Sequence, residues 1–493
     1  MSEILMSIAI DIGASGGRVI LGQFDGSQIK IKELYRFPNS PIRVGESVYW
    51  DVLYLLKEVK KGLRLTAKEY CPEPVSIGLD TWGTDFSLLS ENGSLVDNPH
   101  SYRDPRTDGI MEATFQKVPR SEIYSQTGVQ FMQFNPLYQL YSLVLSESPD
   151  LQIADTFLMV PDLFNYWLSG EKVCEFTNAT TTQFYNPVKG DWAYELLDSL
   201  NIPTRIFPAI QKPATILGHL SPWMQNDTGL KNVPIVAVAS HDTASAASAV
   251  PASHDKYAFL SSGTWSLLGA EVNQAVINEA GLRHNLSCYG GVCDTFLVWK
   301  NIQALWLLQE CQRFWAESGS NYSHQDLVAL ARIAQPFSAI IDSDDRIFLE
   351  SGDMPAKIRL FCERTHQQPP ETPGAVTRCI FESLALKYRW VLENLQKVIG
   401  VELDTIHLVG GGSKNKYLAQ FTADATARCV LAGPSEATAI GNLVAQLIAL
   451  GHLDSLKDAR EMIRNSFKTD RYEPQDPENW NEPYQIFLDL MAG

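Results

Sequence analysis

The turn Gly13-Ala14-Ser15-Gly16-Gly17, followed by Arg18, has the composition of a phosphate-binding turn. Glycines leave successive backbone N–H groups unobstructed, so these groups can form a nest for phosphate oxygens. The Ser15 hydroxyl and the Arg18 guanidinium would add donors, and the guanidinium adds a positive charge. Asp11, just before the turn, could hold Mg²⁺ through water, because this ion dehydrates reluctantly. A Gly-rich hairpin without a ligand is the alternative.

The same turn also matches the G-x-S-x-G pattern of a hydrolase nucleophile. That pattern requires a helix directly after the serine, whereas Arg18-Val19-Ile20-Leu21 is apolar and β-branched and predicts a strand. No helix and no second strand precede Ser15 in the chain, so the sheet that supports such a nucleophile could not be built from earlier residues. The hydrolase interpretation is therefore disfavoured, and labelling of Ser15 with a serine-reactive phosphonate would test it.

A second reactive segment, Ser240-His241-Asp242-Thr243, follows an apolar strand predicted over 233–238. Adjacent side chains on a strand point to opposite faces, so we expect no hydrolytic triad here. A carboxylate at the C-terminal end of a strand is suited to accept the proton of a hydroxyl nucleophile. Asp242 is therefore a candidate general base, and capping of the Ala-rich helix that follows is the alternative.

Three further segments carry groups that could contact a ligand. Asp80-Thr81-Trp82-Gly83-Thr84-Asp85 and Arg103 could present an aromatic wall and polar groups to a polyol; a core tryptophan and a surface ion pair are the alternatives. Ser261-Ser262-Gly263-Thr264 repeats the small-residue turn of the first hairpin. Gly410-Gly411-Gly412 would let a ligand approach the backbone, but it matches no standard nucleotide-binding motif and could be a tight turn.

Strands that alternate with helices predict an α/β protein. A hairpin and a third strand at 8–12, 18–22 and 29–34 precede a helix over 52–65, whose predicted apolar stripe is Leu53, Leu56, Val59 and Leu63. A hairpin recurs after residue 258, so two similar lobes are predicted to join near residue 245. The other expected elements are strands at 75–80, 233–238, 258–260, 266–270, 405–409 and 429–431, helices within 136–168 and at 376–398, 415–426 and 437–450, and a polar loop at 177–182.

Composition limits the classes of partner. The 493 residues carry a formal net charge of −17, which repels nucleic acid and anionic membranes. The apolar residues 4–10 follow Glu3 rather than a basic region, and apolar runs are too short to span a bilayer, so we predict a soluble, cytoplasmic protein. The eight cysteines include no C-x-x-C pair. Cys362 and Cys379 are the one candidate disulfide, against which a reducing compartment would argue.

Taken together, six segments in this order resemble the FGGY carbohydrate kinases, whose two similar lobes have the actin-like/hexokinase-like (ribonuclease H-like) ATPase fold. The resemblance extends from about Ile8 to Leu450. It implies an active site in the cleft between the lobes. The six segments are Asp11–Val19, Leu79–Phe86, Thr177–Gln183, Val238–Ser245, Leu260–Leu267 and Trp299–Ile302.

The resemblance also implies a domain organisation and an activity. An N-terminal lobe at 1–245 would bind the sugar and carry the phosphate hairpin, a C-terminal lobe at 246–455 would bind the nucleotide, and a tail at 456–493 would pack on the lobes. The implied reaction is ATP-dependent phosphorylation of L-rhamnulose to L-rhamnulose 1-phosphate, with Mg²⁺, by a monomer or homodimer. Alternatives are L-fuculose, a pentulose such as ribulose, or a non-catalytic sensor of sugar or nucleotide.

The residue roles below are likewise implied by the resemblance, except for two of the sugar contacts. Asp242 would be the catalytic base, and Asp11 and Asp242 would hold Mg²⁺ through water. The family often has a second serine where this turn has Gly16; the backbone nest survives that change, although a hydroxyl contact to phosphate is lost. The sugar would contact Gly83 and His241 and, as inferred above from the residue types rather than from the resemblance, Trp82 and Arg103. ATP would contact Ala14, Ser15, Gly16, Gly17, Arg18, Thr264, Asn301, Gln309 and Gly411.

Overall fold

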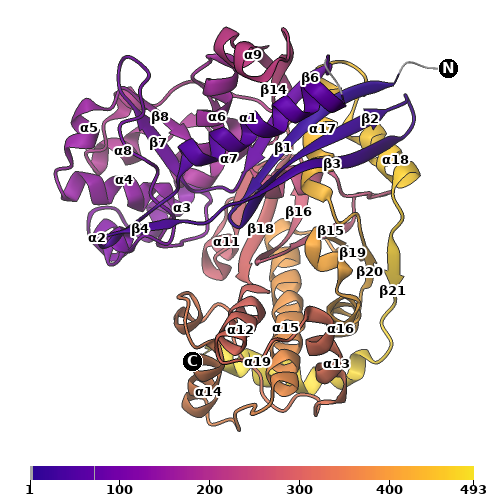
Figure 1. The fold of residues 1–493 in the computed structure, drawn as a ribbon. Helices are drawn as coiled ribbons and strands as arrows, with labels where there is room; N and C mark the ends of the chain where they lie inside the picture. Colours follow the sequence, from indigo (N-terminus) through magenta and orange to yellow (C-terminus); the bar gives the residue numbers. More distant parts are fainter. Residues whose placement is uncertain (1–3, 71–72, 493) are drawn as a thin grey trace. The chain divides into compact units, whose positions relative to one another are not determined.

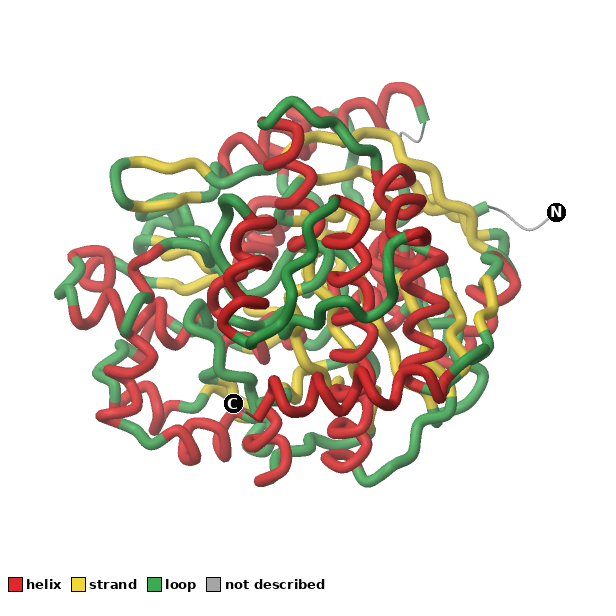
Figure 2. Tube along the Cα trace, turned by 90° about the horizontal axis from the view of Figure 1, so that it is seen from below, coloured by secondary structure: helices red, strands yellow, loops and turns green. Residues whose placement is uncertain are grey.

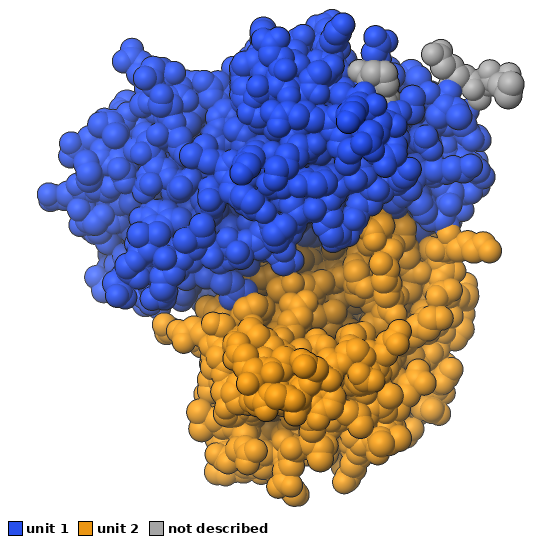
Figure 3. Space-filling model, in the orientation of Figure 1, with its two compact units in different colours: residues 1–253, 271–298, 437–467 blue, residues 254–270, 299–436, 468–493 orange. Residues whose placement is uncertain are grey.

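The computed structural model describes residues 4–70 and 73–492, which form two compact units (Figure 3). Unit 1 contains 1–253, 271–298 and 437–467, and unit 2 contains 254–270, 299–436 and 468–493. Strands and helices are interspersed along the chain (Figure 2), as the alternating sequence pattern predicts. The lobe boundaries predicted at 245 and 455 remain a prediction.

Unit 1 is built on a six-stranded mixed sheet of order β13-β14-β6-β1-β2-β3 (Figure 1). β1 is antiparallel to β2 and parallel to β6, so the predicted hairpin and third strand are confirmed. The strands are β1 (Leu5–Gly13), β2 (Gly16–Phe24), β3 (Ile29–Pro38), β6 (Ser76–Thr81), β13 (Thr215–His219) and β14 (Pro234–Ala237).

Helices cover this sheet according to the alternation of its side chains. Ile77 and Leu79 on β6 join an apolar cluster with residues of α1 (Val52–Glu69) and α6 (Val160–Ser169). Gly78 lies instead against α17 (Ala437–Ala449), where a Cβ would come within 2.7 Å of Asn442 Oδ1. Residues two apart share a face, so Asp80 also belongs to the α17 face. α10 (Asp242–Ser248) contacts β6 and α18 (Leu456–Ser466) contacts β3, whereas α9 (Pro222–Thr228) packs against α1.

The apolar stripe of α1 differs from the predicted one. Asp51 caps the helix by accepting the N–H of Tyr54, and the buried stripe includes Leu55, Val59 and Leu63. Leu53 is 57% exposed, so its predicted burial is wrong. Positions 55, 59 and 63 recur every four residues and hence lie on the face that packs against β2 and β3.

A second apolar cluster in unit 1 lies under a group of short elements. One prediction for this region is corrected, and the prediction of helices within 136–168 is confirmed, with one short strand between them. The segment predicted as a polar loop at 177–182 forms α7 (Phe176–Ala179) and a 3₁₀ turn over Thr180–Thr182, and the helical region contains a strand, β8 (Thr156–Met159). The elements are β7 (Phe86–Leu89), α2 (Ile110–Lys117), α3 (Arg120–Thr127), α4 (Pro136–Leu145), α5 (Pro149–Ile153), β9 (Cys174–Glu175), β10 (Tyr185–Asn186), β11 (Asp191–Trp192), α8 (Tyr194–Ser199) and β12 (Ile210–Gln211).

The second large sheet has the order β17-β18-β16-β15-β19-β20-β21. β15 is antiparallel to β16 and parallel to β19, which repeats the pairing of β1 with β2 and β6. This repeat confirms the internal similarity predicted from the sequence. The strands are β15 (Tyr257–Ser262), β16 (Trp265–Val272), β17 (Ser287–Gly290), β18 (Phe296–Gln303), β19 (Thr405–Val409), β20 (Cys429–Ala432) and β21 (Asp470–Tyr472).

The helices of unit 2 include the long buried helix α15 (Pro373–Ile399), which confirms the prediction at 376–398. Cys362 and Cys379 lie on α14 and α15 as free thiols, so the candidate disulfide is absent from this part of the chain. Across the described residues, no helix has the length and apolar character needed to cross a membrane. The remaining helices of unit 2 are α12 (Trp306–Glu317), α13 (His324–Ile333), α14 (Met354–Arg364), α16 (Lys416–Thr426) and α19 (Asn481–Ala492).

Candidate functional site

Three carboxylates gather at one edge of the unit 1 sheet. Asp11 on β1 lies directly beside Asp80 on β6, and Arg18 on β2 lies opposite Asp11 and forms an ion pair with it. Burial raises the pKa of Asp80 well above its ordinary range, and the charges of Asp11 and then Asp242 raise it further. The structure therefore brings together Asp11, Arg18 and Asp242, which the sequence analysis selected separately.

Asp80 was predicted only as part of the segment 80–85 that could contact a polyol, and its partner Asn442 was not predicted to belong to the site. The Asn442 amide donates to Asp80 Oδ2 at 2.6 Å, while Asp80 Oδ1 is buried and has no hydrogen-bond partner among the described residues. Asn442 Oδ1 accepts in turn from Gln446 at 2.6 Å, and Gln446 accepts from Ser76 at 2.7 Å. Two amides four residues apart on an otherwise apolar helix are the sequence signal that could have identified this polar row.

The glycines of the first turn have a packing role in addition to any role in ligand binding. A Cβ on Gly17 would overlap the Phe37 ring at 2.2 Å, and one on Gly16 would lie 2.9 Å from the Phe37 carbonyl oxygen. β2 starts directly after Ser15, so the expected strand is confirmed and the turn lacks the helix of a hydrolase nucleophile motif. Ser15 itself is exposed, which leaves its hydroxyl accessible to a ligand.

Asp242 occupies the first helical position of α10. His241 is the N-cap residue and makes no capping hydrogen bond, so the alternative that Asp242 caps the helix is wrong. The structure also corrects the expectation that these neighbours face apart: His241 Nε2 lies 3.6 Å from Asp242 Oδ1. The residues stand at a strand-to-helix junction, where the alternation of a strand does not apply.

Burial shifts the pKa values of Asp242 and His241 in opposite directions. It raises the pKa of Asp242 to about 6, although 33% of its side chain remains exposed, and hydrogen bonds from Thr243 offset part of the rise. It lowers the pKa of His241 to about 3, so this imidazole is neutral at physiological pH. Asp242 is therefore by far the better proton acceptor of the two near neutrality.

Gly83 lies against His241, and both residues were predicted to contact the sugar. A Cβ on Gly83 would come within 3.0 Å of the His241 ring. Trp82 is 5% exposed and its indole N–H donates to Asp85 at 2.9 Å, which places its ring in the core. Arg103 is half-buried, with its guanidinium 5.2 Å from the centre of the Tyr102 ring. The sugar-contacting roles of Trp82 and Arg103 stay predictions.

Unit 2 holds four of the residues predicted to bind ATP, namely Thr264, Asn301, Gln309 and Gly411. Thr264, in the turn between β15 and β16, donates its hydroxyl to Gln309 on α12 at 3.3 Å. The Thr264 carbonyl oxygen also accepts the N–H of Trp306 at 3.1 Å, which joins the turn to the first residue of α12. The structure thus brings Thr264 and Gln309 together, and Asn301 lies on the neighbouring strand β18.

The glycine-rich turn after β19 packs against the end of β15. A Cβ on Gly412 would lie 2.3 Å from Ser262 Oγ, and Gly410 has a φ of 79°. Gly411 is exposed and a Cβ there would meet nothing within 4 Å. Close packing therefore explains Gly410 and Gly412, whereas Gly411 leaves its backbone accessible.

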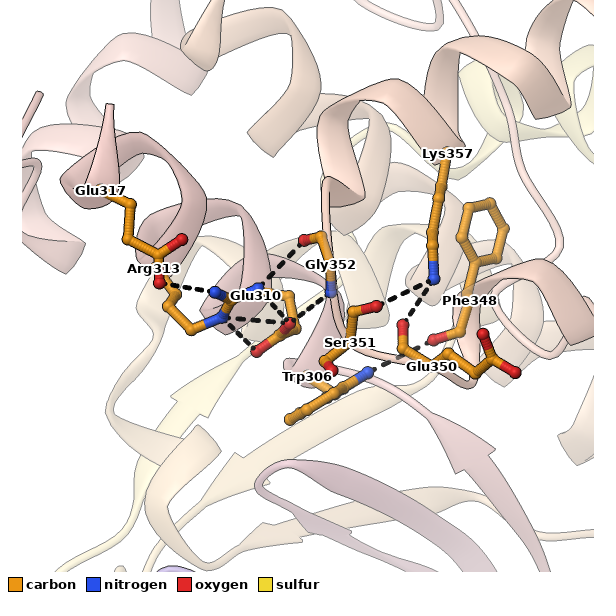
Figure 4. A network of polar contacts seen from close by, with 9 residues as sticks. All are labelled: Trp306, Glu310, Arg313, Glu317, Phe348, Glu350, Ser351, Gly352 and Lys357. Carbon is orange, nitrogen blue, oxygen red and sulfur yellow. Dashed lines mark hydrogen bonds and ion pairs between the residues drawn. The ribbon is translucent and has the colours of Figure 1, made fainter. Parts of the chain in front are cut away.

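A polar network fixes the segment that follows η4 (Arg346–Phe348) onto α12 (Figure 4). Glu310 accepts the N–H of Gly352 at 3.2 Å and pairs with Arg313, which donates to the Gly352 carbonyl oxygen. Lys357 donates to the carbonyl oxygen of Glu350 at 2.7 Å. The contacts of Glu310 and Arg313 fix α12, which carries Gln309, to this segment.

Two family models match this chain. The N-terminal domain of the FGGY family of carbohydrate kinases matches residues 6–248, and the C-terminal domain matches residues 258–450. The chain belongs to the FGGY family of carbohydrate kinases. A rhamnulokinase of Bacteroides thetaiotaomicron is 42% identical to this FGGY kinase, over 98% of this chain and 99% of the relative. One of Oceanobacillus iheyensis is 38% identical over 94% and 97%.

Solved structures of other sugar kinases share the fold. Xylulose kinase from Lactobacillus acidophilus matches this FGGY kinase with a TM-score of 0.81 at 17% identity, over 99% of this chain and 98% of that one. Glycerol kinase from Plasmodium falciparum, solved with ADP, matches with a TM-score of 0.79 at 14% identity, over 100% and 98%. The predicted fold class of two similar ATPase-like lobes is confirmed.

Proposed function

We propose that this FGGY kinase transfers the γ-phosphoryl group of ATP to the terminal hydroxyl of L-rhamnulose, giving L-rhamnulose 1-phosphate. Family membership supports a sugar kinase, and the names of the relatives at 38–42% identity support the choice of ketose. The observation that carries the proposal is Asp242, whose carboxylate stands partly exposed at a helix start and is not used as a cap.

Asp242 acts as the general base in the proposed reaction. A sugar hydroxyl becomes a competent nucleophile when its proton has an acceptor within about 3 Å. With a pKa of about 6, the carboxylate is mostly ionised at pH 7 and still basic enough to accept that proton. Neutral His241, packed against Gly83, would orient the sugar by hydrogen bonding and exclude water from one side of it.

The carboxylates of unit 1 fit a role in holding Mg²⁺ through water. Carboxylate oxygens are the ligands this ion prefers, and Asp80 Oδ1 is a buried oxygen that lacks a partner within the described chain. Among the described residues no three acidic, histidine or cysteine side chains lie close enough to ligate a metal directly. Asp11 and Asp242 would thus contact the hydrated ion, which would neutralise charge on the phosphates when bound.

Phosphate binding in the proposal rests on both hairpin turns. Arg18 and the backbone of Ala14, Ser15, Gly16 and Gly17 would neutralise phosphate oxygens, because phosphoryl transfer needs positioning and charge stabilisation more than covalent help. In unit 2, Thr264, Asn301, Gln309 and Gly411 would contact the nucleotide. The exposed Gly411 backbone and the paired Thr264 and Gln309 support this assignment.

The test is a screen of ADP release and sugar phosphate formation over ketoses and polyols. We expect the highest kcat/KM with L-rhamnulose. A higher value with L-fuculose or ribulose would overturn the choice of sugar but not the kinase. Binding of ATP and ketose without turnover would favour a sensor and overturn the catalytic proposal.

A further inference from the structure

The junction that carries Asp242 depends on a buried carboxylate that none of the roles above uses. Glu175, at the end of β9, is 0% exposed and lies beneath Ser240 and His241. Its Oε2 accepts the backbone N–H of Ser240 at 3.0 Å and the Ser240 hydroxyl at 2.7 Å. A charged acceptor forms roughly twice as strong a hydrogen bond to backbone N–H as a neutral one.

The contact extends to His241 through a hydroxyl. Thr177 donates its hydroxyl to Glu175 Oε2 at 2.6 Å, and the Thr177 hydroxyl oxygen accepts the backbone N–H of His241 at 3.3 Å. A hydroxyl has one proton, so donation to Glu175 leaves the Thr177 lone pairs directed at His241. The carboxylate therefore holds the N–H of Ser240 directly and that of His241 through the Thr177 hydroxyl.

The other side of the junction is held by the sheet. The Ser240 carbonyl oxygen accepts the N–H of Thr81 at 2.9 Å, at the end of β6. Glu175 is itself anchored, because its N–H donates to Asp162 on α6 at 3.0 Å and its side chain accepts the N–H of Thr177 at 2.9 Å. The backbone of Ser240 is thus held by β6 through its carbonyl oxygen and by Glu175 through its N–H.

We propose that Glu175 is a positioning residue for the phosphoryl transfer, holding the Ser240–His241 backbone so that Asp242 meets the sugar hydroxyl at hydrogen-bonding distance. This inference rests on the proposed function of Asp242. Glu175 contacts neither base nor substrate, and it acts through the N–H groups of Ser240 and His241. Misplacement of a reacting group by about 1 Å can cost 10²-fold in rate.

Glu175→Gln is the direct test. It replaces one acceptor oxygen by an NH₂ group, which opposes a donor whichever way the amide is turned. We expect kcat to fall about tenfold or more, while the KM for ATP stays within twofold of wild type. Glu382→Gln is the matched control: Glu382 is a 1% exposed carboxylate that accepts the N–H of Phe337 at 2.8 Å, but in unit 2. It should lower the melting temperature and leave kcat within twofold.

A second comparison separates positioning from general destabilisation. In an Asp242→Asn background the base is already lost, so Glu175→Gln should lower the remaining rate less than twofold, because effects that act through one group are not additive. A tenfold loss in both backgrounds, or an unchanged kcat in a folded Glu175→Gln single variant, would overturn the proposal. If Glu175→Gln does not fold, Thr177→Val replaces it, since it removes the hydroxyl that holds His241 but keeps the carboxylate; an unchanged kcat would again overturn the proposal.

The wild-type chain distinguishes this failure from that of the proposed function. Lack of phosphorylation of any ketose by wild type would refute the kinase proposal itself. Once the wild type is shown to phosphorylate a ketose, the positioning role of Glu175 is tested only by the ratios of kcat between the variants and wild type.

Discussion

Replacement of Asp242 by asparagine keeps the shape of the side chain and removes its ability to accept a proton. Loss of a general base typically lowers the rate by about 10²–10⁴-fold, or about 2.7–5.4 kcal/mol of transition-state stabilisation. We expect a loss in this range for ketose phosphorylation by Asp242→Asn. Nucleotide affinity should persist, since the residues assigned to ATP are unchanged and Asp11 can still contact the hydrated Mg²⁺. A kcat within threefold of wild type, about 0.65 kcal/mol, would refute the assignment.

The raised pKa of Asp242 adds a pH test of the same prediction. With a pKa of about 6 instead of the ordinary 3.8, the carboxylate is about 90% ionised at pH 7 and about 9% at pH 5. The wild-type kcat/KM should therefore fall about tenfold between pH 7 and pH 5, with a slope approaching one. Product should be measured directly by mass spectrometry, because coupling enzymes have pH profiles of their own. A profile that is flat from pH 7 to pH 5 would show that this carboxyl is not the titrating base.

Three other changes test the remaining parts of the site. Arg18→Ala removes a guanidinium from the first turn and should weaken ATP turnover about tenfold or more, measured as kcat/KM for ATP; wild-type kinetics would show that the hairpin does not hold phosphate. Gly83→Ala places a Cβ 3.0 Å from the His241 ring, so the KM for the ketose should rise severalfold while that for ATP stays constant, and an equal rise in both would contradict the sugar assignment. Asn442→Leu leaves Asp80 Oδ2 without its donor and should destabilise the fold by about 1–3 kcal/mol, seen as a lower melting temperature; an unchanged midpoint would show that this bond contributes nothing to stability.

Local sequence patterns determined most of the fold and the chemistry of its turns. The β-branched run after Ser15 predicts the strand that the structure contains, because strand preference and apolar alternation are properties of a few neighbouring residues. The same holds for the long helix α15 and for the repeat of the hairpin at β15 and β16. The ordered set of motifs was sufficient to predict the family, which requires residue types in sequence and no distances.

Tertiary structure alone decided which distant residues share an environment. Asn442 donates to Asp80 from 362 positions away, and Glu175 holds Ser240 across 65 positions. Sequence patterns report the face on which a residue lies but not the element that covers this face, so neither partner could be predicted. The pKa of about 6 at Asp242 has the same origin, because desolvation is the sum over all atoms that exclude water from the carboxylate, wherever they lie in the chain.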